Sequence, residues 1–287
     1  MSSRIFDIGM NNGDDTAYYL EKGFQVVAVE ANPQLADQAR ARFREAIDDG
    51  KLVILNVGIA KEEGNLPFWI CDTHDAWSSF DQSRASRENS THHEISVPCR
   101  RFHSIVEEFG TPYYLKVDIE GHEHLCLEAF KSHSLPKYIS VEASGVGLLD
   151  SLAELGYKQF KCLSQFHYLP LEIPPTSQQR DCELALALQN SRNIYVRIFK
   201  RLGGRIWISR LWNQNLRDAN WVFPHGSTGP FGEGLPGEWQ SYDAMRETFQ
   251  IYQQMANSGY KTGCYSPFWN DSECSFWADF HATGADS

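Results

Sequence analysis

Long apolar runs and closely spaced cysteine pairs are absent from this 287-residue sequence. No stretch of about 18 uncharged apolar residues occurs, so we do not expect a membrane-spanning helix. The first residues lack the basic and apolar regions of a secretory signal. The seven cysteines have no CxxC spacing, which argues against a disulfide framework and against a structural zinc site. Together these absences predict a cytoplasmic protein with reduced thiols.

Basic residues are also scarce, and the net charge is −11. This balance argues against a surface that binds nucleic-acid phosphates, which requires clustered Lys and Arg. The exception is the segment 192–217, which holds seven basic residues and no acidic one. Apolar residues are interleaved with these charges: Ile194, Ile198, Phe199, Leu202, Trp207 and Leu211. A solvated face is the favoured interpretation, and peripheral contact with a membrane surface or an anionic partner is the alternative.

Up to about residue 160, short apolar runs alternate with amphipathic segments, the pattern of βα units. The expected strands are residues 5–8, 26–29, 52–55, 113–117, 138–141 and 157–163. Four helices are expected. The first starts near residue 14, the second spans residues 33–50, the third includes residues 125–130, and the fourth spans residues 148–155. Residues 58–98 break this rhythm and predict a hairpin with an irregular Ser- and Asp-rich insertion. The pattern predicts an α/β fold with a doubly wound, mostly parallel sheet.

Beyond about residue 165 the regular pattern stops. Pro and Gly become frequent, and six of the eight tryptophans lie from residue 207 onward. We therefore expect residues 1–165 to form the cofactor-binding core, and residues 166–287 to form a loop-rich, aromatic-rich extension that shapes an acceptor pocket. These aromatic residues could equally be ordinary core.

A D-x-G-x-x-x-G turn, from Asp7 to Gly13, links the first expected strand to the first helix. Gly9 permits a tight turn and close ligand approach, and Gly13 permits close helix–strand packing. The middle glycine of a dinucleotide-binding turn is missing, and an acid comes first. This combination favours a ligand with a cationic amino-acid end over a diphosphate. Asp7 could attract its ammonium group, and turn amides could bind its carboxylate.

Glu30 ends the second expected strand, where a carboxylate can accept hydrogen bonds from both hydroxyls of a ribose. Asn56 and Val57, after the third strand, should face the adenine. The expected cofactor-binding residues are Asp7, Gly9, Met10, Asn11, Asn12, Gly13, Thr16, Glu30, Ala31, Asn56, Val57 and Asp118. The alternative for the turn is a tight βα loop without a ligand.

Three segments resemble the FkbM family of methyltransferases: residues 6–13 (FDIGMNNG), 29–33 (VEANP) and 114–123 (YLKVDIEGHE). The last block is the most specific, and the resemblance spans residues 4–163. It implies a class I, Rossmann-like methyltransferase fold and S-adenosyl-L-methionine as the methyl donor. It also implies O-methylation of natural-product or sugar hydroxyls. Asn12 and Asp14 depart from the apolar or aromatic residues expected there.

Transfer to oxygen requires removal of a proton from the acceptor, and the block at residues 118–124 offers suitable groups. His122 is the expected general base, and Asp118 and Glu120 are expected to face the bound ligands. Alternatively, Asp118, Glu120 and Glu142 could hold one Mg²⁺, which we do not favour, or the carboxylates could order the loop.

Ser79, Glu142 and His225 are further candidates for contact with the acceptor. The sequence thus predicts an S-adenosylmethionine-dependent O-methyltransferase that acts on a hydroxyl of a small molecule, sugar or glycan. Two other functions remain open. One is a non-catalytic methyltransferase-like binding module. The other is a nucleotide-cofactor oxidoreductase, which the missing glycine disfavours.

Overall fold

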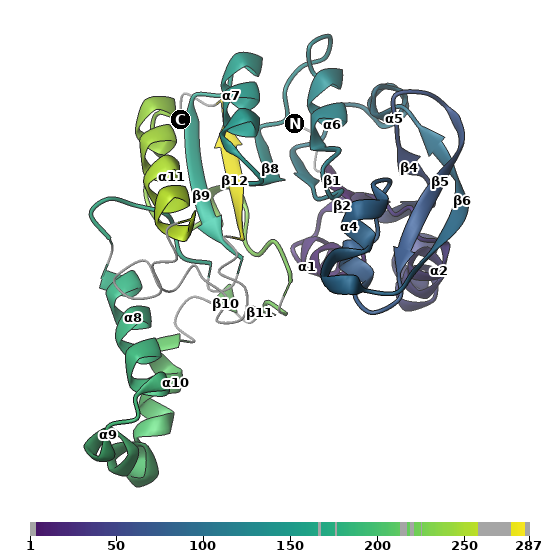
Figure 1. Cartoon of the computed structure of the whole chain (residues 1–287). Helices are drawn as coiled ribbons and strands as arrows, with labels where there is room; N and C mark the ends of the chain where they lie inside the picture. Colours follow the sequence, from purple (N-terminus) through teal and green to yellow (C-terminus); the bar gives the residue numbers. More distant parts are fainter. Residues whose placement is uncertain are drawn as a thin grey trace. The chain divides into compact units, whose positions relative to one another are not determined.

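The computed structural model describes residues 4–165, 168–175, 177–212, 217–218, 221–224, 226–257 and 277–284 (Figure 1). The chain divides into two compact units. The first comprises Met1–Glu142, Asp150–Tyr157 and Ala282–Ser287, and the second comprises Ala143–Leu149 and Lys158–His281. The expected division at residue 165 stays a prediction.

The first unit contains five parallel strands. These are β1 (Arg4–Ile8), β2 (Gln25–Val29), β3 (Leu52–Leu55), β7 (Tyr114–Val117) and β8 (Tyr138–Glu142). Their order is β3-β2-β1-β7-β8, so the winding reverses between β1 and β7. This reversal confirms the predicted doubly wound, mostly parallel sheet. In such sheets, ligands bind beyond the carboxyl ends of the strands at the point of reversal.

Helices cover both faces of β1. The ring of Phe6 meets those of Phe102 and Phe109 edge-on, with centroids 6.3 and 6.4 Å apart, on α5 (Phe102–Phe109). The next residue, Asp7, points to the opposite face and contacts α1 (Asp14–Glu21). Both side chains are fully buried. Burial on both faces explains why apolar residues flank Asp7 in β1 and why β2 is apolar from residue 26 to 29.

The long helix expected over residues 33–50 is two helices in the structure, α2 (Pro33–Arg42) and α3 (Arg44–Asp48). They are separated by Phe43, whose backbone leaves the helical region at φ −108° and ψ 24°. Asn32 caps α2, because its side chain accepts a hydrogen bond from the Gln34 amide at 3.0 Å.

The segment after β3 forms a separate small sheet. Its strands are β4 (Gly58–Ile59), β5 (Gly64–Cys71) and β6 (His92–Arg100), in the order β4-β6-β5. β5 and β6 pair antiparallel along their length, which confirms the predicted hairpin. Between them lie η1 (Asp75–Trp77), α4 (Gln82–Ala85) and η2 (Arg87–Asn89).

The remaining helices of the core follow the expected order. α6 (Glu123–Ala129) comes after β7, and α7 (Val146–Leu155) comes after β8. β9 (Gln159–Ser164) then joins the sheet.

The sequence misses one strand of the main sheet. β12 (Ala278–Thr283) lies between β8 and β9 in the seven-stranded order. The amides of Ala143 and Gln165, just past the ends of β8 and β9, donate to the carbonyls of Ala278 and Trp277 at the start of β12. β12 therefore runs against its neighbours, and β9 forms the edge of the sheet beyond it.

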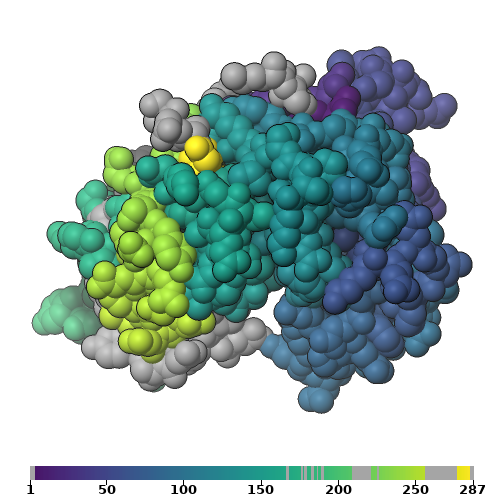
Figure 2. All heavy atoms as spheres, turned by 90° about the horizontal axis from the view of Figure 1, so that it is seen from above, coloured from purple at the N-terminus to yellow at the C-terminus, as the bar shows by residue number. Residues whose placement is uncertain are grey.

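The segment after residue 165 is also richer in helix than expected. It contains α8 (Ser177–Asn190), α9 (Ile194–Phe199), η3 (Lys200–Gly204), α10 (Arg205–Trp212) and α11 (Tyr242–Asn257). Short elements complete it: β10 (Arg217–Asp218), β11 (Trp221–Val222) and η5 (Gly232–Gly234). The outer face of α11 forms part of the surface, coloured yellow-green in Figure 2.

Two expectations drawn from the composition can be compared with the structure. Within the described ranges, no helix combines the length and hydropathy needed to cross a bilayer. Four cysteines, Cys71, Cys99, Cys126 and Cys162, are free and buried. This state agrees with the expectation of unpaired thiols.

Candidate functional site

Gly9, Glu30 and Asp118 lie together at the edge of the sheet where the winding reverses. Each directly follows the last residue of its strand, and those last residues are aligned in register. The Gly9 amide donates to the Val29 carbonyl at 2.9 Å, and the Asp118 amide donates to the Ile8 carbonyl at 2.9 Å. We call these three residues and the turn from Gly9 to Gly13 the strand-end edge.

The two glycines of the turn are required by close packing. Gly9 has φ +84°, and a Cβ on it would lie 1.8 Å from the Asp118 carbonyl oxygen. The close neighbour of Gly9 is thus the chain after β7. The sequence predicts close approach of a ligand to this glycine. Gly13 has φ +81°, and its missing Cβ leaves room for the ring of Phe43, which would be 2.6 Å away. Gly13 therefore allows close packing against the junction of α2 and α3. The sequence predicts that this glycine allows close packing of a helix against a strand.

Glu30 presents a buried carboxylate that two backbone amides hold in place. Its Oε2 accepts from the Asn11 amide and its Oε1 from the Asn32 amide, each at 2.8 Å. The residue is 8% exposed. Burial raises the pKa of Glu30, while the hydrogen bonds from Asn32 and Asn11 oppose that rise. The carboxylate is therefore fixed in orientation before any ligand arrives.

Asp7 is engaged on both of its oxygens. Oδ1 accepts from Lys116 Nζ at 3.0 Å, and Oδ2 accepts from the Thr16 hydroxyl at 2.6 Å. Asp7 and Thr16 are both fully buried. Asp7 is thus already paired within the protein, and Thr16 anchors α1 to β1. The contacts of Asp7 and Thr16 with a cofactor stay predictions.

Lys116 is the residue of this site that sequence reasoning missed. Its Nζ donates to the Gly9 carbonyl at 2.9 Å and lies 3.6 and 4.0 Å from carboxylate oxygens of Asp15 and Asp118. Burial lowers the pKa of Lys116, but the carboxylates outweigh this effect and raise it above the usual value. The available signal was a lysine within the otherwise apolar strand 114–117, because a buried charge requires partners.

Asp118 keeps an accessible carboxylate, with 44% of its side chain exposed. Desolvation raises the pKa of Asp118, and the negative charges of Glu120, Glu123 and Asp15 raise it further. Lys116 opposes this shift. Asp118 therefore combines an accessible charge with a surplus of negative charge around it.

Glu120 is held by two arginines. Its Oε2 accepts from Arg84 at 2.9 Å and from Arg87 at 2.6 Å, and 14% of its side chain is exposed. The expectation that Asp118 and Glu120 share a face fails because β7 ends at Val117, so strand alternation no longer applies. Glu120 instead adopts φ +52° and ties the insertion to the loop after β7. This arrangement supports the alternative that the carboxylate orders the loop.

The pairing of Glu120 also bears on the proposed Mg²⁺ site. A carboxylate neutralised by two guanidinium groups is a poor cation ligand. Among the residues that the structure describes, no group of three His, Cys, Asp or Glu side chains is arranged to hold a metal ion. The residues present therefore do not fit a magnesium ion held by Asp118, Glu120 and Glu142.

His122 stands immediately before α6 with its ring half-buried. Its Nδ1 is buried and has no hydrogen-bond partner in the described part of the chain. Burial lowers the pKa of His122. The negative charge of Glu123 raises it, while His124 and Arg84 lower it further. The lowered pKa keeps the imidazole neutral near pH 7, which is the form that a general base requires.

Four amides of the turn already donate hydrogen bonds within the protein. Those of Gly9 and Met10 donate to the Val29 carbonyl, and that of Gly13 donates to the Met10 carbonyl at 3.0 Å. The Asn11 amide donates to Glu30, as described above. The sequence predicts that amides of the turn bind a ligand carboxylate. The amides at these four positions are not free to donate to it.

The remaining residues expected at the cofactor stabilise the edge. The Asn56 side chain donates to the carbonyls of Glu30 and Ala31 at 2.8 and 3.2 Å, which fixes the chain after β2. Val57 is half-buried. Asn12 is exposed, and its side chain bonds to Asp14.

Two of the three acceptor candidates lie within the described residues. Ser79 is 1% exposed, and its hydroxyl donates to the Glu120 carbonyl and accepts from the Asp81 amide. The structure thus gives Ser79 a structural role in place of the predicted acceptor contact. Glu142 ends β8 and is half-buried. His225 lies outside the described residues.

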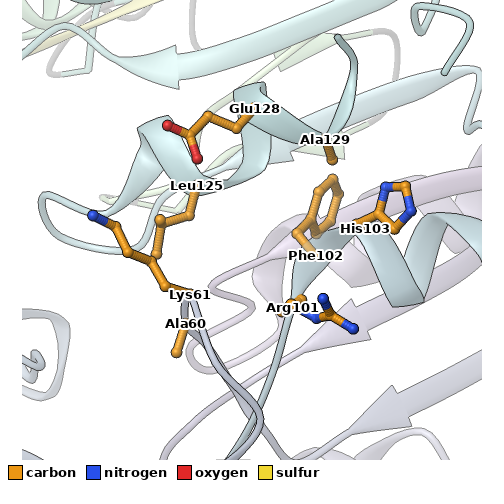
Figure 3. A pocket seen from close by; sticks show the side chains of 8 residues that line it. All are labelled: Ala60, Lys61, Arg101, Phe102, His103, Leu125, Glu128 and Ala129. Atoms are coloured by element: carbon orange, nitrogen blue, oxygen red, sulfur yellow. The ribbon is translucent and has the colours of Figure 1, made fainter. Parts of the chain in front are cut away.

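A separate pocket of about 250 Å³ lies between the start of α5, α6 and the chain after β4 (Figure 3). Its lining residues are Ala60, Lys61, Arg101, Phe102, His103, Leu125, Glu128 and Ala129. Figure 3 shows the apolar side chains of Phe102 and Leu125 among the charged ones. The pocket shares no residue with the strand-end edge, so we assign it no part in the chemistry.

A family model described as the methyltransferase FkbM domain matches residues 7–159, which is 153 of the 287 residues. The chain belongs to this family of methyltransferases. The match begins at Asp7 and therefore includes the whole strand-end edge.

Two solved structures are similar to parts of the chain. The methyltransferase FkbM from Methylobacillus flagellatus KT is 18% identical with a TM-score of 0.37, over 54% of this chain and 36% of its own. The precorrin-6y C5,15-methyltransferase from Geobacter metallireducens GS-15 is 12% identical with a TM-score of 0.33, over 56% of this chain and 65% of its own. The match thus spans less than two thirds of either protein. No curated protein matches the sequence significantly.

Proposed function

We propose that the protein is an S-adenosyl-L-methionine-dependent O-methyltransferase that acts on a hydroxyl of a small molecule, sugar or glycan. Membership of the FkbM methyltransferase family supports the reaction class. The observation that carries the proposal is the preoriented Glu30 carboxylate at the strand-end edge.

Glu30 fits the ribose of an adenosyl ligand. A carboxylate offers roughly four acceptor positions, and the amides of Asn11 and Asn32 use one on each oxygen. Each oxygen therefore retains capacity for one further donor, which matches the two neighbouring hydroxyls of a ribose. The carboxylate needs no reorientation to bind them, which reduces the entropic cost of binding.

Asp118 replaces Asp7 as the proposed partner of the ligand's ammonium group. Asp7 is fully buried and lies 3.0 Å from Lys116 Nζ. Asp118 is accessible, lies 4.0 Å from the same ammonium, and has the carboxylates of Glu120, Glu123 and Asp15 around it. A cation placed beside Asp118 would lower its raised pKa and relieve the repulsion from Glu120.

The cofactor would supply an electrophilic methyl group on a sulfonium. Alignment of the acceptor with that methyl could lower the barrier by ~7–11 kcal/mol. His122 would take the acceptor proton, a role typically worth about 10²–10⁴-fold in rate. We propose base catalysis over a magnesium-activated acceptor, because Glu120 is committed to Arg84 and Arg87.

Calorimetric titration of the full chain with S-adenosylhomocysteine tests the ribose contact. Glu30→Gln retains the size of the side chain but removes the charge and half of the acceptor capacity, so we expect at least a tenfold weaker affinity, about 1.4 kcal/mol. Glu45→Gln, on the exposed face of α3, is the matched control and should bind as the unaltered protein does.

An unchanged dissociation constant for Glu30→Gln, with the fold intact by circular dichroism, would remove the ribose assignment. Binding of NAD(H) in place of S-adenosylhomocysteine would favour the oxidoreductase. Binding without turnover across a panel of hydroxyl acceptors would favour the non-catalytic module.

A further inference from the structure

Residues 192–212, which we call the basic arm, form a helical hairpin in the second unit. α9 leads through η3 into α10, and α10 packs against α8 (Figure 1). The turn is tightly built, because a Cβ on Gly204 would lie 2.5 Å from the ring of Phe199. The rings of Phe199 and Trp207 meet edge-on with centroids 6.0 Å apart. The tip of the arm is therefore an ordered element.

Large apolar side chains are concentrated and exposed on this arm. Of the twelve exposed large hydrophobic residues in the described chain, seven lie between residues 194 and 207. Leu202 is 82% exposed, Tyr195 77% and Ile206 63%. The others are Ile194, Ile198, Phe199 and Trp207. Soluble proteins seldom expose such a patch unless it binds something.

The spacing of the four exposed apolar residues of α9 gathers them on one side of that helix. Ile194 and Ile198 are four residues apart, as are Tyr195 and Phe199, so each pair stacks along α9. Leu202 lies in the turn that follows α9. The arm thus presents an apolar surface of aliphatic and aromatic side chains.

The charges on the arm are all positive. Arg192, Arg197, Arg201 and Arg205 are exposed, and no acidic residue occurs from 192 to 217. Within the described ranges, none of these four arginines forms an ion pair with a carboxylate. They stand on a chain whose net charge is −11.

We propose that the basic arm docks on the surface of a bilayer that contains anionic lipids. Interfacial helices combine aromatic and aliphatic residues, which enter the headgroup region, with Lys and Arg, which face anionic headgroups. The arm has both components on one ordered element. A nucleic acid would need the cations but not the exposed aliphatic side chains. Binding of the arm to a second copy of this acidic chain is a distinct outcome of the test.

Vesicle sedimentation of the full chain tests this assignment. We expect binding to phosphatidylcholine vesicles that contain about 30% phosphatidylserine, and at least tenfold weaker binding to phosphatidylcholine alone. Raising the salt from about 0.1 M to about 0.5 M should weaken the binding, because headgroup charges are then screened.

Two arm variants separate the contributions. Arg197→Glu with Arg201→Glu, and Tyr195→Ser with Leu202→Ser, should each lower the vesicle affinity at least tenfold. Arg44→Glu with Lys158→Glu makes the same change in net charge at exposed positions outside the arm and should bind vesicles far more strongly than the arm charge variant. Circular dichroism should show the same fold for all of them.

The proposal is overturned if anionic vesicles do not bind the protein, or if both arm variants bind them as the unaltered chain does. It is also overturned if light scattering finds a dimer that the arm variants disrupt while vesicles stay unbound, since the arm would then cover a second copy.

Discussion

At the scale of single residues, the strand-end edge depends on how its buried charges are compensated. Lys116 is 3% exposed, and an unpaired ammonium there would be very unfavourable. Its contacts with Asp7, Asp15 and the Gly9 carbonyl join β7, β1 and α1 at the turn. The lysine therefore fixes the backbone that presents the accessible carboxylate of Asp118.

Asp118→Asn should change how stability depends on pH. The pKa of Asp118 is raised in the folded protein, so the folded state binds the proton more tightly than the unfolded chain does. Stability is therefore lost as the pH rises from the unfolded value, about 4, through the folded pKa. The variant lacks this loss and should melt at a higher temperature than the unaltered protein near pH 8 but not near pH 4.

Thermal melting of both proteins across this pH range checks the prediction. Asp75→Asn, at an exposed position in η1, should leave the pH profile unchanged. A melting temperature for Asp118→Asn that falls below that of the unaltered protein near pH 8 would mean that the contact with Lys116 outweighs the repulsion from the other carboxylates.

His122→Ala should lower kcat by about 10²–10⁴-fold and leave the affinity for S-adenosylhomocysteine unchanged, because the proposed base acts on the acceptor alone. Burial lowers the pKa of His122, so the acidic limb of the kcat profile should lie below pH 6.5 in the unaltered enzyme. His93→Ala, on the exposed edge of β6, is the control. Full activity of His122→Ala would assign proton removal to another group or to alignment alone.

The residue scale is also where the sequence was least informative about the site. The positions of Glu30 and Gly9 followed from strand ends and turn chemistry. The burial of Asp7 did not, because its partner Lys116 is 109 residues away along the chain. Local pattern indicates that an acid belongs at the turn, but only the tertiary structure decides whether that acid faces solvent or a buried cation.

At the scale of elements, the insertion between β4 and β6 supports the loop after β7. Arg84 from α4 and Arg87 from η2 both reach the Glu120 carboxylate. Gly121 allows this approach, since a Cβ there would be 2.8 Å from the Arg84 guanidinium. The small sheet thus holds the chain between Asp118 and His122 in one conformation.

Replacing both arginines should loosen that loop. Arg84→Ala with Arg87→Ala leaves the largely buried Glu120 carboxylate without its partners, and we expect a loss of about 1–3 kcal/mol in unfolding free energy. Hydrogen exchange should accelerate at the amides of residues 119–122 and not in β1. Adding Glu120→Gln should restore most of the protection; unchanged exchange in the double variant would show that the loop is ordered without the arginines.

The elements of the Rossmann-like core were predictable, because buried parallel strands and amphipathic helices leave strong periodic signals. The sequence did not predict β12 or α11. Helix α11 nevertheless carries Met245, Phe249 and Tyr252 at helical spacing, and all three side chains are buried. The ring of Phe249 packs on Phe280 of β12, with centroids 4.6 Å apart. The frequent Pro and Gly residues before α11 obscured this pattern. A strand such as β12, inserted between two others, is specified by tertiary pairing rather than by its neighbours in sequence.

At the scale of the whole molecule, the family match, the reversal of winding between β1 and β7, and the preoriented Glu30 carboxylate converge on one location. Ligands of open α/β sheets bind at this location for a geometric reason, since adjacent strands there lead to opposite faces and leave a crevice. In the proposed complex, the acceptor is defined by whatever lies beyond the sulfur of the cofactor.

A crystal structure of the full chain with S-adenosylhomocysteine is the most direct measurement. We predict both ribose hydroxyls within about 3 Å of the Glu30 oxygens, and the ammonium group beside Asp118. A ligand bound elsewhere, or a ribose with no contact to Glu30, would contradict the assignment of the strand-end edge as the cofactor site.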